Sequence, residues 1–110
     1  MEGPSIRSSP RLSLRNPVEI RVGKRTIRIP KALGNLSAGG LFVNAEDLPV
    51  NTAVQVKIAA ARAFEAEGVV RFSEPQGGGV GIEFTAITDA NRKRLDELIV
   101  ELTKKEVLAS

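Results

Sequence analysis

The sequence is organised around Asn35-Leu36-Ser37-Ala38-Gly39-Gly40, which is followed at once by the apolar run Leu41-Phe42-Val43. Asn and Ser side chains form hydrogen bonds with nearby backbone or with a ligand, and adjacent glycines permit positive φ and close approach by another molecule. The stretch therefore has two interpretations. It is a tight reversal between two strands, or it forms one wall of a polar site together with groups elsewhere in the chain.

A second polar element lies upstream, in Arg7-Ser8-Ser9-Pro10-Arg11. Pro10 restricts the residue before it to extended backbone, so the two arginines do not share a helix face and can approach a ligand from different sides. A guanidinium group pairs bidentately with phosphate or with the O6 and N7 atoms of guanine. Together with Asn35 and Ser37, the arginines suit a ligand that carries both guanines and phosphates. They also suit the phosphates of RNA.

Composition limits the remaining function classes. The 110 residues fit one domain, and with 42% apolar residues but only four Phe and no Tyr or Trp, its core must be aliphatic. No apolar run approaches the ~20 residues that span a bilayer, and no apolar signal segment begins the chain, so we expect a cytoplasmic protein without a membrane span. The chain has no Cys and no His. We therefore expect no metal site, no catalytic residues and no enzyme activity.

The net charge of +3 is distributed unevenly along the chain. Residues 1–31 carry eight Lys and Arg against two acidic residues, whereas residues 32–110 carry eight basic and eleven acidic residues. A basic N-terminal segment on a mildly acidic body indicates either an anionic partner or a solvated basic face. Charge alone does not decide between them.

Six strands are predicted where apolar and polar residues alternate. Residues 1–15 are expected to form an irregular basic arm, because Pro4, Pro10 and four Ser disfavour a helix, and residues 16–110 are expected to form the folded domain. The predicted strands cover residues 18–22, 27–33, 41–43, 54–58, 64–73 and 80–84. In the fifth of these, Phe72 is expected to share one face with Phe64, Ala66, Gly68 and Val70.

A helix over about residues 88–106 is predicted after the strands, with Thr88 or Asp89 as its N-cap. Its apolar stripe consists of Leu95, Leu98, Ile99 and Leu102, at the spacing i, i+3, i+4 and i+7. Such a stripe packs on a core. The expected fold is therefore mainly β, a six-stranded antiparallel β-barrel with the C-terminal α-helix covering one opening.

The two polar elements, their order and the strand pattern resemble the PilZ domain, a bacterial receptor module for cyclic di-GMP. That family is marked by RxxxR on an N-terminal arm and by [D/N]xSxxG about 20–30 residues later. The chain has these as Arg7 to Arg11 and Asn35 to Gly40. The resemblance extends to Pro17-Val18-Glu19-Ile20, Gly40-Leu41-Phe42-Val43 and Gly79-Val80-Gly81-Ile82-Glu83-Phe84.

The resemblance implies a ligand site of six residues: Arg7, Arg11, Asn35, Ser37, Gly39 and Gly40. The two arginines would bind guanine edges and phosphates, the asparagine a guanine edge and the serine a phosphate. Gly40 would allow close approach of the ligand, and Gly39 would contribute its backbone. The Ser8 position often holds a second Arg in the family, so one cation is missing here.

Two further arginines are candidates for ligand contact. Arg11 and Arg15 also have the RxxxR spacing, so the register of the motif is either Arg7/Arg11 or Arg11/Arg15. We prefer the first, because its spacing from the first predicted strand is closer to that of the family. Arg71 either stacks on a guanine or is a solvated charge on a strand.

The expected function is a non-catalytic module that binds cyclic di-GMP. Binding would order an arm that is mobile in the free protein, and the change would be read by a separate effector protein. The alternative is an adaptor with the PilZ fold that binds a protein and no nucleotide. Nucleic acid is not an expected partner, because RNA-binding barrels rely on aromatic stacking platforms and the chain lacks Tyr and Trp.

Overall fold

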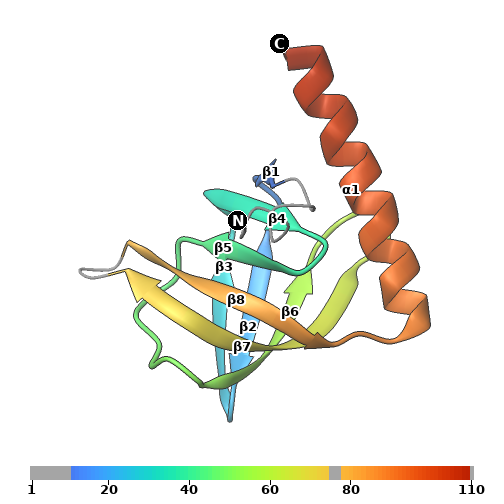
Figure 1. Ribbon diagram of the computed structural model, residues 1–110. Coiled ribbons are helices and arrows are strands. Elements are labelled where there is room, and N and C mark those ends of the chain that lie inside the picture. Colours follow the sequence, from blue (N-terminus) through green and yellow to red (C-terminus); the bar gives the residue numbers. More distant parts are fainter. Residues whose placement is uncertain (1–10, 75–77, 110) are drawn as a thin grey trace, which may run out of the picture.

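The computed structural model describes residues 11–74 and 78–109, and the elements in this part of the chain are eight strands followed by one helix (Figure 1). The strands are β1 (Leu12–Leu14), β2 (Val18–Val22), β3 (Arg25–Ile29), β4 (Gly34–Ser37), β5 (Gly40–Val43), β6 (Ala53–Ile58), β7 (Phe64–Glu74) and β8 (Gly79–Ala86). The helix is α1 (Asp89–Ala109). The protein is therefore mainly β, as expected.

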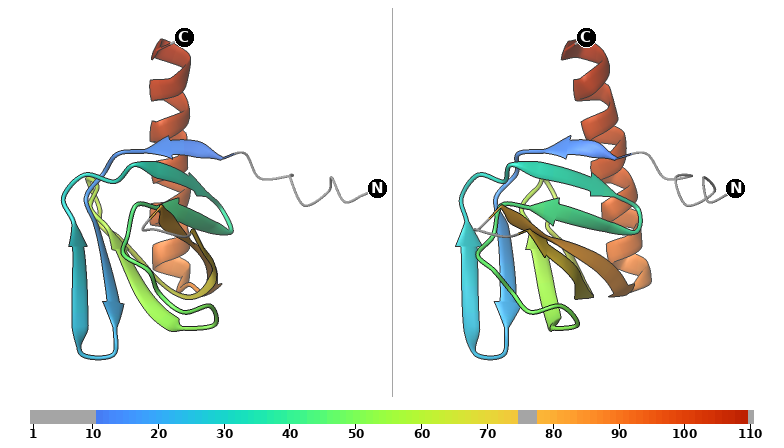
Figure 2. Two further views of the ribbon diagram at one scale, coloured as in Figure 1. Left: turned by 90° about the vertical axis from the view of Figure 1, so that its left-hand side faces the viewer. Right: turned by 60° about the vertical axis from the view of Figure 1, so that its left-hand side comes forward.

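All eight strands belong to one antiparallel sheet, in the order β1-β4-β5-β8-β7-β6-β2-β3. The sheet curves strongly, so that β1, β4 and β5 cross the direction of the β2–β3 hairpin (Figure 2). Within the described residues, β1 and β3 are its two ends and do not pair with each other. The expected six-stranded barrel is thus wrong in two respects: residues 11–74 and 78–109 form eight strands, and the sheet that these strands make is not closed.

Three short segments account for the difference in strand number and length. Leu12–Leu14, placed in an irregular arm by the sequence, is a strand whose two leucines are buried while Ser13 is exposed. Gly34–Ser37 is also a strand, paired on one side with β1 and on the other with β5. In contrast, β3 ends at Ile29 and does not resume through Leu33, because Pro30 has no N–H group for the ladder.

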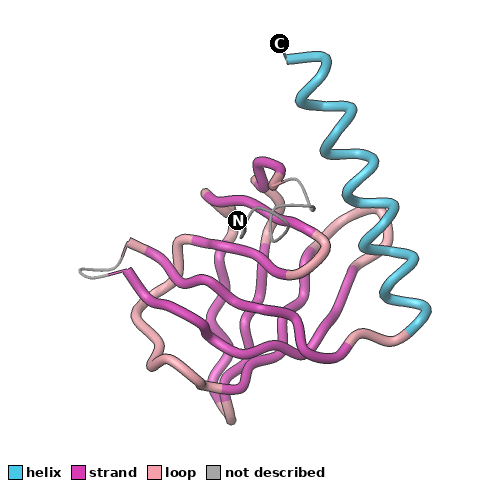
Figure 3. Tube along the Cα trace, viewed as in Figure 1, coloured by secondary structure: helices cyan, strands magenta, loops and turns pink. Residues whose placement is uncertain are grey.

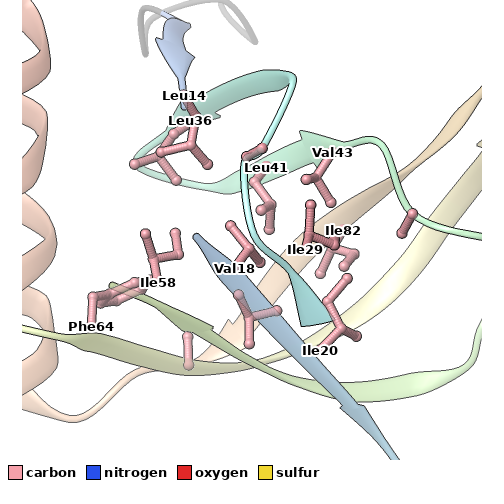
Figure 4. Close-up of a cluster of buried hydrophobic side chains, with 14 of the residues drawn as sticks. Leu14, Val18, Ile20, Ile29, Leu36, Leu41, Val43, Ile58, Phe64 and Ile82 are labelled. Carbon is pink, nitrogen blue, oxygen red and sulfur yellow. The ribbon is translucent and has the colours of Figure 1, made fainter. Parts of the chain in front are cut away.

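The core lies on the inner face of the curved sheet. Apolar side chains from both ends of the sheet meet there, among them Leu14 and Leu36 from β1 and β4 and Val18 and Ile58 from β2 and β6 (Figure 4). Alternation produces this arrangement, since every second residue of each strand points inward. The core is aliphatic apart from Phe64, with Phe84 packed edge-on against its ring.

Helix α1 begins as the sequence predicts and then extends beyond the sheet (Figure 3). The Asn91 N–H group donates to Thr88 Oγ1 at 3.1 Å, which makes Thr88 the N-cap. Leu95, Leu98 and Leu102 are buried in the core, which confirms the predicted apolar stripe. The helix also protects the sheet edge, because Glu106 Oε2 accepts a 2.7 Å hydrogen bond from the Ser13 N–H group of β1.

Candidate ligand-binding site

The RxxxR element and the Asn35–Gly40 element meet where the side chains of Arg11 and Asn35 are in contact. Leu12 of β1 points inward and pairs with Leu36 of β4, so Arg11 and Asn35 both lie on the outer face. The Nε atom of Arg11 donates a 2.7 Å hydrogen bond to Asn35 Oδ1. The guanidinium group is thereby oriented by the sheet itself. Arg7 lies outside the described residues.

Beside this contact is a shallow pocket of about 520 Å³, here called the candidate pocket. It is lined by Arg11, Ser37, Gly39, Gly40, Leu41, Arg71, Phe72, Gly81, Ile82 and Glu83. Asn35 does not line it but holds Arg11 at its margin. A second depression of about 550 Å³ lies over β2, β6 and β7, and its lining contains none of the predicted site residues. The candidate pocket is the one that gathers the motif residues.

Ser37 closes the turn between β4 and β5. Its hydroxyl is buried, accepts a hydrogen bond from the Gly39 N–H group at 3.3 Å and donates one to the Gly40 carbonyl at 3.4 Å. The Gly39 carbonyl in turn accepts from the Phe84 N–H group of β8 at 2.9 Å. The stretch is therefore a tight reversal between two strands, and Ser37, Gly39 and Gly40 also line the candidate pocket. Its role in ligand binding stays a prediction.

The two glycines of this turn have different roles. A Cβ atom on Gly40 would lie 2.2 Å from the Ile82 carbonyl oxygen, so only glycine lets β5 pair with β8 at this position. A Cβ atom on Gly39 would meet nothing within 4 Å. The sequence predicted that a ligand comes close to the backbone at Gly40, but it is strand β8 that lies against this glycine. Gly39, in contrast, has open space beside it.

A β-bulge in β7 places Arg71 and Phe72 in this pocket beside Glu83 of β8, a combination that sequence reasoning did not make. The register between β7 and β8 shifts between Val70 and Phe72: Val70 pairs with Ile82, which is buried in the core, and Phe72 pairs with Gly81. Phe72 therefore lies on the outer face, and the expectation that it shares a face with Val70 is wrong. Arg71, in the bulge, donates from Nε to Glu83 Oε1 at 2.5 Å.

Phe72 is the large apolar side chain of the candidate pocket that stands most open to solvent, with an exposed fraction of 46%. Its ring stacks on Phe42 with the ring centroids 5.7 Å apart and the planes at 15°. The only sequence signal for its position was the break in alternation at Val69-Val70, which is too weak to reveal a bulge.

Arg15 is turned away from the candidate pocket. Its Nη1 atom donates to the Leu14 carbonyl at 2.9 Å and to the Gly34 carbonyl at 3.4 Å. Arg11 lines the pocket and Arg15 does not. This difference supports Arg11 as a ligand residue, while the pairing of Arg11 with Arg7 stays a prediction.

Neither a metal-binding cluster nor a membrane-spanning helix is found in the described part of the chain. Within residues 11–74 and 78–109, no group of three or more His, Cys, Asp or Glu side chains is arranged to hold a metal ion. In the same residues, no helix combines the length and the apolar character needed to cross a membrane.

Comparison with known proteins gives the family and the fold. The family model of the PilZ domain matches residues 5–101. Among solved structures, the Bacillus subtilis inhibitor of motility MotI (DgrA) superposes with a TM-score of 0.71 at 22% identity, covering 90% of this chain and 52% of MotI. The chain thus spans about half the length of MotI. A structure described as the PilZ domain of Escherichia coli YcgR with c-di-GMP has a TM-score of 0.69 at 14% identity, covering 91% of this chain and 93% of that one. No curated protein sequence matched.

Proposed function

Since the chain belongs to the PilZ domain family, we propose that it is a non-catalytic module that binds cyclic di-GMP at the candidate pocket. The observation that carries this proposal is the hydrogen bond from Arg11 to Asn35 at the margin of that pocket. It joins the two motif elements into one preorganised polar group. The YcgR domain of similar fold is described with c-di-GMP bound, which supports the same ligand here.

The chemistry of the pocket suits a compact anionic ligand. Its volume of about 520 Å³ falls in the usual range for small-molecule sites, and Arg11 and Arg71 line it. Arg11, together with Arg7 from the preceding segment, would pair with phosphates and guanine edges. The Asn35 Oδ1 atom is bonded to Arg11, and its amide N–H₂ group has no partner among residues 11–74 and 78–109, so we expect this group to donate to a guanine edge.

Ser37 and Gly39 supply the remaining contacts in this proposal. The hydrogen bond that the Ser37 hydroxyl donates to the Gly40 carbonyl is long, at 3.4 Å, so the hydroxyl can exchange it for a hydrogen bond to a phosphate oxygen. Gly39 leaves open space beside it for the phosphate. Gly40 contributes by holding β5 against β8 and thereby fixing the floor of the pocket.

Signalling would follow from the position of Arg7. A ligand held by Arg11 and also by Arg7 fixes the segment before β1 against the outer face of the sheet. We propose that this ordered segment is the surface read by a separate effector protein in the cytoplasm. Amide hydrogen exchange tests this step: protection should rise at residues 2–10 on ligand addition and change little in β6. Protection of residues 2–10 before ligand is added would contradict it.

Titration calorimetry with cyclic di-GMP tests the binding itself. We expect a saturable heat, a higher melting temperature with ligand, and an affinity that falls as salt is added, because phosphates face arginines. Absence of heat and of any melting shift at millimolar ligand would overturn the proposal. The chain would then be an adaptor with this fold that binds a protein and no nucleotide.

A further inference from the structure

The β-bulge at Arg71 exposes an aromatic ring where a regular sheet would bury it. A Cβ atom on Gly81 would lie 2.2 Å from Cε1 of Phe72, so the ring fills the space that the glycine leaves. Phe42 stacks on it from β5 and limits its rotation. The result is a fixed ring in the wall of the candidate pocket that also holds Arg11. Nucleotide bases stack on such rings in many binding proteins.

A carboxylate lies on the same face, two residues from Gly81 on β8. This places Glu83 about 7 Å along the strand from the residue opposite Phe72. One carboxylate oxygen, Oε1, accepts from Arg71, and the side chain is half exposed within the candidate pocket. The other oxygen, Oε2, has no partner among the described residues. A base that stacks on Phe72 can therefore direct its edge at two neighbouring groups, the Glu83 carboxylate as acceptor and the Arg71 guanidinium as donor.

The order of these groups matches one purine. The Watson–Crick edge of guanine presents two donors, N1–H and N2–H₂, next to the acceptor O6. A carboxylate accepts from the two donors, and the adjacent guanidinium donates to O6. Adenine presents the acceptor N1 next to the donor N6–H₂, so its N1 lone pair would face a carboxylate that has nothing to donate. Two acceptors that face each other weaken the binding of the wrong base, and the site discriminates against it for this reason.

We propose that Phe72, Glu83 and Arg71 form a subsite that selects guanine over adenine in the bound cyclic dinucleotide. Phe72 is the stacking surface, Glu83 reads N1–H and N2–H₂, and Arg71 orients Glu83 and donates to O6. The proposal rests on cyclic di-GMP binding at the candidate pocket and extends it to residues outside both motif elements.

The decisive variant is Glu83→Gln, titrated with cyclic di-GMP and with cyclic di-AMP. Glutamine can accept from N6–H₂ and donate to N1, so it complements the adenine edge. We expect about tenfold weaker binding of cyclic di-GMP and tighter binding of cyclic di-AMP. The matched control is Glu19→Gln, which removes a carboxylate that also pairs with an arginine, Arg28, but lies on β2 outside the candidate pocket. It should leave both affinities unchanged.

Phe72 is tested by comparing a variant that keeps the ring with one that removes it. Phe72→Leu should weaken the binding of both ligands by about tenfold. The ratio of the two affinities should not change, because stacking does not depend on which groups the edge of the base carries. Phe72→Tyr should bind like the wild type. Melting curves without ligand check that each variant is folded.

The outcomes separate this subsite from the binding proposal that it depends on. If the wild type binds cyclic di-GMP but Glu83→Gln keeps the wild-type ratio of affinities, the subsite is wrong and the binding proposal stands. The subsite is also wrong if Phe72→Leu binds both ligands like the wild type. If the wild type binds no cyclic di-GMP, both proposals fail together.

Discussion

Arg11 and Asn35 are 24 positions apart in the chain, yet the Nε atom of one donates a 2.7 Å hydrogen bond to the Oδ1 atom of the other. The antiparallel pairing of β1 with β4 produces this contact, since Ser13 lies opposite Asn35 and Arg11, two residues before Ser13, is on the same face. The two motifs are thus joined by the fold before any ligand arrives. Less conformational entropy of Arg11 then has to be lost on binding.

Arg11→Ala should weaken cyclic di-GMP binding by about 1.5–3 kcal/mol, the range for hydrogen bonds to charged groups. Arg28→Ala is the matched control, because it removes an exposed cation from β3, outside the candidate pocket. Calorimetric titrations of the two variants at one salt concentration make the comparison. Equal losses would mean that only the net charge matters and that Arg11 has no specific contact.

Leu14→Ala should lower the free energy of unfolding by about 2–5 kcal/mol, because Leu14 is fully buried in the core. Leu33→Ala is the same chemical change at a side chain that is 54% exposed, and it should cost less than about 0.5 kcal/mol. Urea melts measure both. A wild-type midpoint for Leu14→Ala would show that β1 does not contribute to the core.

Leu98→Asp should destabilise the protein strongly, because it places a charge at a position that is 2% exposed against the sheet. Val100→Asp introduces the same charge two residues further along α1, where the side chain is 53% exposed. We expect its urea midpoint to stay close to that of the wild type. The helix would have to pack by another face if the two variants behaved in the opposite way.

Gly40→Ala and Gly39→Ala separate the structural glycine from the one that borders the ligand. The first should cost about 1–3 kcal/mol of stability, since its methyl group would overlap the Ile82 carbonyl of β8. The second should leave stability unchanged and weaken ligand binding, because its methyl group would extend into open space beside the pocket. Thermal melts and calorimetry on both variants test this, and a stable Gly40→Ala would contradict the close strand pairing.

Much of the fold was predictable because it rests on local patterns. Alternation identified β2, β6, β7 and β8, and the spacing from Leu95 to Leu102 identified α1 with its cap at Thr88. In contrast, β1 and β4 have three and four residues. Their strand character comes from pairing with partners far away in the sequence, which a local pattern cannot show.

The candidate site was predictable to the extent that it consists of motif residues. Arg11, Ser37, Gly39 and Gly40 line one pocket, and their binding of a ligand stays a prediction. Phe72 could not be found in this way, because a bulge changes which face a side chain occupies and leaves no clear trace in the sequence. Glu83 keeps the face that alternation predicts, but its place beside Arg71 depends on the pairing of β7 with β8. The role of Gly40 was also hidden, since its neighbour is the backbone of β8.

Amide chemical shifts followed by NMR during a cyclic di-GMP titration test the central claim most directly, because they report both binding and its location. We expect saturable changes that are largest at Ser37, Gly39 and Gly81, which line the candidate pocket. Gly23 and Gln55, which line the depression over β2, β6 and β7, should change little. Changes confined to Gly23 and Gln55, or no changes at millimolar ligand, would contradict the account.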